Sequence, residues 1–104
     1  MNIEFKDGVP IHGLSPFIYE AIFAAGLLFT KFNKTLVVTS TTDGKHMDKS
    51  FHYSGHAFDI RTYRYSRYDI LKLATELQHV LKDISHCFQV VIESNHIHVE
   101  FDWR

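Results

Sequence analysis

The feature that most constrains the fold is a strict alternation of residue types near the end of the chain. Residues 96–101 read HIHVEF, so every second side chain is apolar. Successive side chains of a strand point to opposite faces, so one face here is apolar and the other carries two histidines and a glutamate. The run 88–93 is also strand-like, and Ser94-Asn95 between the two runs favours a tight turn. The pattern predicts a hairpin within a sheet that has one buried face and one polar face.

Two further strands are predicted earlier in the chain, near 35–40 and 56–62. Both runs are rich in β-branched and apolar residues and are bounded by turn-forming residues. We expect the four strands to pair largely antiparallel. The polar segment 41–54 contains Asp43-Gly44, a turn signal, and predicts a long loop of the kind that often carries function.

Two helices are predicted, near 16–32 and 66–84. Ser15 can cap the first free amide groups of the first helix, and Pro16 fits its first position. The apolar residues of this helix occupy nearly its whole circumference, so we expect other elements to wrap it. Ser66 precedes an amphipathic pattern at helical spacing, which predicts the second helix.

We therefore expect a single α+β domain over residues 1–104. A small antiparallel four-stranded sheet has both main helices packed on one face, and its polar face is left for a functional site. The predicted core includes Ile22, Leu28, Val38, Ile70, Leu77, Val91, Ile97 and Val99.

Composition excludes several classes of protein. The 104 residues include 11 basic and 12 acidic ones, and a near-neutral chain is a poor candidate for binding nucleic acid, which needs a basic face. Cys87 is the single cysteine, which excludes an internal disulfide and a multi-cysteine zinc site. The most apolar stretch, 17–29, contains Glu20 and is shorter than the ~20 residues of a membrane span. The chain starts without a secretory signal pattern, so we expect synthesis in the cytoplasm. We also expect a monomer.

Histidine is the residue type that departs most from expectation, with eight in the chain. Two of them project from one face of the strand 96–101, within reach of one metal ion. Residues 50–59 read SFHYSGHAFD and place Asp59 in an apolar strand, where a carboxylate is costly to bury unless it is paired or bound to a metal. Together with a histidine of this segment and the nearby carboxylate of Glu93, this set matches the three ligands and open position of a catalytic zinc site.

The pattern S-x-H-x-x-G-x-A-x-D over residues 50–59, followed by H-x-H at 96–98, resembles the zinc D-Ala-D-Ala metallopeptidase superfamily. That group includes D,D-carboxypeptidases, L-alanyl-D-glutamate endopeptidases of phage endolysins, lysostaphin-type enzymes and the hedgehog domain. Every fixed residue of the first motif matches. The resemblance implies one zinc ion bound by His52, Asp59 and His98.

The resemblance leaves the general base open between Glu93 and His96. In members with H-x-H, the first histidine lies beside the metal and assists catalysis. Other members have an acidic base three residues before the last ligand, but here that position is Asn95, which cannot act as a base. Glu93 precedes His96 by three residues, and E-x-x-H is also a spacing of the family. His96 in place of His98 is therefore the alternative third ligand.

Substrate contacts are predicted in the loop before the first motif. Members often have an arginine there, whereas this chain has Lys45 and His46, so these two residues and Ser50 are the predicted substrate-binding residues.

The function that the resemblance implies is hydrolysis of peptide bonds in the stem peptide of bacterial peptidoglycan, with a metal-activated water as nucleophile. The reaction would be of the D-Ala-D-Ala carboxypeptidase or the L-Ala-D-Glu endopeptidase type. A short chain without a signal pattern fits a phage-type enzyme that reaches the cell wall at lysis or as part of the virion. The alternatives are a non-catalytic zinc-containing binding module, as the hedgehog domain illustrates, and a structural component of the virion.

Overall fold

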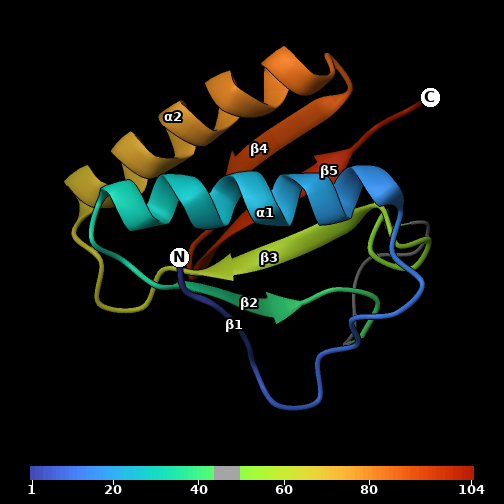
Figure 1. Ribbon diagram of the computed structural model, residues 1–104, viewed down its shortest axis with the longest axis horizontal. Helices are drawn as coiled ribbons and strands as arrows, with labels where there is room; N and C mark the ends of the chain where they lie inside the picture. The colour runs from blue at the N-terminus through green and yellow to red at the C-terminus, as the bar shows by residue number, and fades with distance from the viewer. Residues whose placement is uncertain (44–49) are drawn as a thin grey trace.

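A five-stranded mixed sheet with both helices on one side forms an α+β fold (Figure 1). The computed structural model describes residues 1–43 and 50–104. The order of the strands across the sheet is β1-β2-β3-β5-β4. The elements in chain order are β1 (Ile3–Phe5), α1 (Pro16–Lys31), β2 (Leu36–Ser40), β3 (Ala57–Arg61), α2 (Arg67–Ile84), β4 (Phe88–Ile92) and β5 (His96–Phe101).

The predicted elements all form, and each end agrees with the prediction within one residue. The prediction of a four-stranded antiparallel sheet is wrong in one respect, because β1 adds a fifth strand that runs parallel to β2. Ile3 pairs with Leu36 at the start of this ladder. The three residues of β1 are too few to show a period in the sequence. Helix α1 connects β1 to β2, which is the kind of crossover that a parallel pair requires.

The helix starts confirm the capping interpretation. Ser15 Oγ accepts a hydrogen bond from Phe17 N at 3.2 Å, and Pro16 is the first residue of α1. Ser66 Oγ accepts one from Asp69 N at 3.0 Å. Each serine satisfies an amide group that the helix itself leaves without an acceptor.

Helix α1 is not wrapped on all sides, contrary to the expectation from its apolar circumference. Tyr19, Phe23 and Leu27 follow one another at four-residue steps and are between 44% and 54% exposed. Residues at this spacing share one face of a helix, and here that face is exposed. The opposite side buries Ile18 and Phe29 in the core.

The core lies between the helices and the apolar face of the sheet. Ile70 packs partly buried against it, and the other predicted core residues are buried, with one exception. Val91 is 41% exposed because it pairs with His98 and so lies on the polar face of the sheet. The continuous run Val90-Val91-Ile92 gave no alternation from which to assign its faces.

The polar face of the sheet is set by the same alternation. In β3, Phe58 and Ile60 are fully buried in the core, so Asp59 and Arg61 lie on the opposite face.

Within the part of the chain that the structure describes, no helix combines the length and apolar character that a membrane crossing needs.

Candidate metal centre

Two of the predicted ligands come from neighbouring strands in the middle of the sheet. Strand β3 pairs antiparallel with β5, and Asp59 lies directly opposite His98. Side chains of directly opposed residues lie on the same face with Cβ atoms about 4.5–5.5 Å apart. Ile97 and Val99 are fully buried, which confirms the predicted orientation of β5 with His98 on the polar face.

His52 reaches the same point from the loop before β3. Ser50 Oγ accepts a hydrogen bond from His52 N at 3.2 Å, and Gly55 N donates one to His52 O at 3.0 Å. Gly55 has a φ of 76°, and a Cβ added there would lie 2.5 Å from Gly13 O. The turn therefore requires glycine both for its left-handed backbone and for the close approach of another segment.

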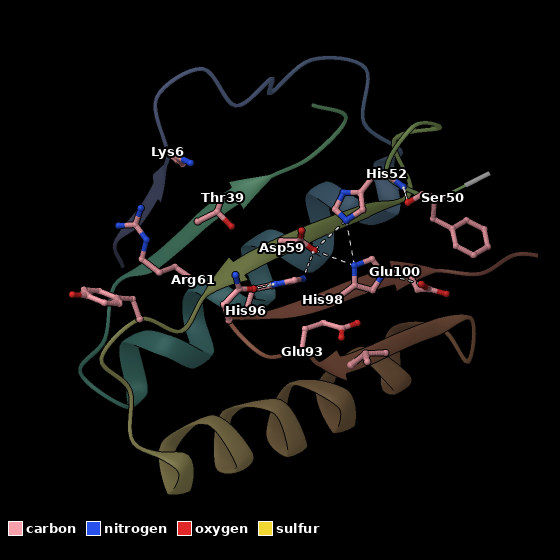
Figure 2. A pocket seen from close by; sticks show the side chains of 14 residues that line it. Lys6, Thr39, Ser50, His52, Asp59, Arg61, Glu93, His96, His98 and Glu100 are labelled. Atoms are coloured by element: carbon pink, nitrogen blue, oxygen red, sulfur yellow. Dashed lines mark hydrogen bonds and ion pairs between the residues drawn. The ribbon is translucent and has the colours of Figure 1, made fainter. Parts of the chain in front are cut away.

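The three predicted ligands converge on one point (Figure 2). His52 Nε2 lies 3.1 Å from Asp59 Oδ1 and 3.2 Å from His98 Nδ1, and the last two atoms are 3.0 Å apart. Four ligands at about 2.1 Å in a tetrahedral arrangement would lie about 3.4 Å from one another. The observed triangle needs only a small expansion to reach that spacing.

Hydrogen bonds on the far side of each imidazole determine which nitrogen faces the triangle. His52 Nδ1 donates to the main-chain oxygen of Thr41 at 2.6 Å, so Nε2 is the unprotonated nitrogen of the neutral ring. His98 Nε2 donates to Glu100 Oε1 at 2.8 Å, so Nδ1 is the nitrogen without a proton while this ring is neutral. Partners of this kind fix the tautomer and orientation of metal-binding histidines.

Three electron-pair donors therefore point at one another inside the polar face. The arrangement is repulsive unless a cation or a proton lies among them. Two imidazoles and a carboxylate are ligands that suit divalent transition ions. The group of His52, Asp59 and His98 could hold such an ion, with His52 only 2% and Asp59 only 7% exposed.

The charges in this group depend on one another. Burial acts to raise the pKa of Asp59, but its interactions with His52 and His98 outweigh burial and hold that pKa well below its usual range. Burial acts to lower the pKa of His98, but Asp59 and Glu100 on either side of the ring raise it above its ordinary value. When no metal ion is bound, a proton on His98 between two carboxylates relieves the repulsion.

His96 lies beside the three ligands on the same face of β5. Its Nε2 is 3.6 Å from Asp59 Oδ1. Its Nδ1 donates a hydrogen bond to Asn95 Oδ1 at 2.6 Å, so Nε2 is the nitrogen that can accept a proton. Asn95, which cannot itself act as a base, thus orients the histidine that can.

Glu93 stands at the end of the hairpin, on the wall of a cleft of about 850 Å³ in the polar face. Its main-chain N–H donates to His96 O at 2.9 Å, which closes the tight turn predicted at Ser94-Asn95. The side chain is exposed, and within residues 1–43 and 50–104 its carboxylate makes no hydrogen bond or ion pair. The carboxylate is therefore exposed at the wall of the cleft.

Of the three predicted substrate-binding residues, Lys45 and His46 lie outside the described residues. Ser50 lines the cleft, and its hydroxyl group also accepts the hydrogen bond from His52 N. This contact gives Ser50 a part in shaping the ligand loop.

Several residues of the site were missed from the sequence. Arg61 lines the cleft two residues after Asp59, so the alternation of β3 was a usable signal for it. Lys6 also lines the cleft, but it follows the unpredicted strand β1. Thr41 acts through its main-chain oxygen, which no side-chain motif reveals.

No protein-family model matches the chain, and no characterised protein sequence shows significant similarity to it. The resemblance to zinc peptidases therefore depends on the motif residues and their geometry alone.

Proposed function

We propose that this protein is a zinc-dependent metallopeptidase that hydrolyses peptide bonds in the stem peptides of bacterial peptidoglycan. The observation that carries the proposal is the convergence of His52, Asp59 and His98 in an open cleft that His96 and Glu93 also line. Three protein ligands with an open position are typical of catalytic zinc sites, whereas structural sites are closed by four. The motif resemblance supports the substrate class. It also supports a phage-type enzyme that reaches the cell wall at lysis or as part of the virion.

Zinc, when bound, supplies Lewis acidity that lowers the pKa of a water molecule to about 7 and polarises a carbonyl group. The protein's own residues then manage the proton. His96 Nε2 can accept it, because Nδ1 keeps its own proton on Asn95. Glu93 offers a carboxylate on the cleft wall as a second acceptor. The group that takes the proton from water later donates it to the leaving amine.

Metal content is the first test. We expect one zinc ion per chain by elemental analysis after reconstitution at neutral pH. His52→Ala and Asp59→Ala should each abolish binding, because two ligands do not form a stable site. His79→Ala is the matched control, since His79 is exposed on α2 and away from the cleft. Absence of metal in the reconstituted wild type would contradict the proposal.

Activity is the second test, with zinc-loaded protein, defined muropeptides and mass spectrometry of the products. Loss of a general base costs about 100- to 10,000-fold in rate, so whichever of Glu93→Gln and His96→Ala shows this loss with zinc retained identifies the base. If His96→Ala loses zinc and His98→Ala retains it, the ligand assignment is wrong. If the wild type releases no new amines, the enzyme proposal is wrong, and a non-catalytic binding module or a virion component would account for the site.

A further inference from the structure

The side of the cleft nearest β1 carries two cationic side chains. Lys6 and Arg61 both line the cleft, and Figure 2 shows them with Thr39 on one side of the ligand group. Ser50 lies on the opposite side of the same view. The cleft therefore has a basic side, built from segments other than the loop in which the sequence predicted substrate contacts.

The register of the sheet places this basic side at a definite distance from the metal ligands. Arg61 lies on the same face of β3 as Asp59, two residues further along, and opposite His96. Two residues of a strand span about 6.6 Å. Lys6 is anchored by its main-chain N–H, which donates to Val38 O at 2.9 Å. Strand β1, which ends just before Lys6, lies two positions from β3, or about 9.6 Å across the sheet. The long side chains of Lys6 and Arg61 can bridge this distance.

Among the described residues, these two cations lack ion-pair partners of the kind that Lys34 and Lys72 have. Lys34 pairs with Asp69 at 3.3 Å, and Lys72 pairs with Glu76 at 3.4 Å. Across the described ranges 1–43 and 50–104, the side chains of Lys6 and Arg61 make no ion pair or hydrogen bond. Two like charges on one side of a cleft repel each other, and an anion between them relieves this repulsion.

We propose that Lys6 and Arg61 bind a carboxylate of the peptide substrate that lies close to the bond that is cut. This inference rests on the proposed function and deepens it. An extended peptide advances about 3.3 Å per residue, so a carboxylate on the residue next to the scissile bond can lie within the span from Asp59 to Arg61. The arginine fork matches a carboxylate with two hydrogen bonds, and the lysine adds a point charge. The carboxylate belongs either to an acidic residue within the peptide or to the end of its chain.

The test compares stem peptides that differ only in one carboxylate. One pair has the D-glutamyl α-carboxyl group free or amidated, and a second pair has the terminal carboxyl group free or amidated. With zinc-loaded protein, Arg61→Ala and Lys6→Ala should each raise KM for the free form about 5- to 50-fold and leave kcat nearly unchanged, because the contact does not change during the reaction. For the amidated peptide of the same pair, the two substitutions should change KM little. The pair whose free form shows the rise in KM identifies the source of the carboxylate.

Arg67→Ala is the matched control, since Arg67 is an exposed arginine at the start of α2 and does not line the cleft. It should bind and cleave all four peptides as the wild type does. The preference for the free form should also weaken as salt rises.

Calorimetric titration with the same peptides separates this inference from the proposed function. If no peptide is cleaved, a preference for the free carboxylate that disappears in the Arg61→Ala, Lys6→Ala double variant still supports the binding site. The inference is overturned if the wild type binds free and amidated forms equally, if no peptide binds, or if the double variant keeps the preference.

Discussion

Glu100 is expected to control the metal affinity of the site without touching the metal, and Glu100→Gln tests this. Glu100 Oε1 accepts the hydrogen bond of His98 Nε2 at 2.8 Å, and its side chain is only 23% exposed. The carboxylate makes the ring a better electron-pair donor and holds Nδ1 toward the other ligands. Glutamine keeps the size of the side chain and removes its charge. Loss of such a partner typically lowers metal affinity about 10- to 100-fold, or about 1.4–2.7 kcal/mol.

Glu93→Gln provides the matched control on the same face of the sheet. It is the same chemical change, but the Glu93 carboxylate makes no hydrogen bond or ion pair with any described residue. We therefore expect its metal affinity to equal that of the wild type. Under the proposed function this variant tests the base, so the two substitutions separate metal binding from proton transfer.

The assay is competition for zinc with a chromophoric chelator at pH 7.5 and constant ionic strength. Thermal unfolding of the metal-free variants checks that both are folded. The difference between Glu100→Gln and the wild type should narrow at lower pH. Glu100 also helps to raise the pKa of His98. Its removal therefore weakens the binding of the competing proton to His98 as well as the binding of the metal. Equal zinc affinity of Glu100→Gln and wild type, or an equal loss in Glu93→Gln, would refute the reasoning.

Three further outcomes are expected. Gly55→Ala should lower the free energy of unfolding by more than the roughly 1 kcal/mol that a left-handed backbone costs by itself, because the added Cβ also meets Gly13 O. Gly8 has φ at 84° and open space around it, so Gly8→Ala should show the backbone cost alone. Denaturant unfolding compares the two variants. The pKa of His98 is raised in the folded metal-free protein, so its stabilising contribution should be full below about pH 6.5 and be lost as pH rises through the folded pKa, as thermal unfolding against pH can show. Trp103 is the single tryptophan and its ring centroid lies 5.2 Å from that of Phe51, next to a ligand, so zinc titration should change its fluorescence.

The sequence was sufficient for the parts of the fold that have a clear period. The alternation of residues 96–101 predicted the buried face and the polar face of β5, and the helical spacing of residues 66–84 predicted α2. The group of His52, Asp59 and His98 was implied by the motif resemblance, and the structure brings these three side chains together. These predictions worked because each depends on local chemistry that a few residues determine.

The parts that the sequence did not reveal depend on contacts between distant segments. Strand β1 forms because Ile3 packs against Gly26 of α1, where an added Cβ would lie 2.5 Å from the Ile3 side chain. Val91 looked like a core residue because neither of its neighbours is polar, and only the register with His98 shows which face it takes. The hydrogen bond from His52 to the Thr41 main chain also joins two segments whose approach no motif specifies.

The core residues of β5 and its candidate metal ligand, His98, are placed by one register. A slip of one residue would turn Ile97 and Val99 toward solvent and bury His98 with its neighbouring polar side chains. Burying charged or polar groups without partners costs several kcal/mol, so the slipped pairing is unstable and the ligand geometry is held by the same energy that holds the core. Residues on the cleft wall such as Glu93 and Arg61 carry no comparable share of that energy, because both are exposed. Substitutions on the wall can therefore change the chemistry of the cleft while the fold and the ligand group persist.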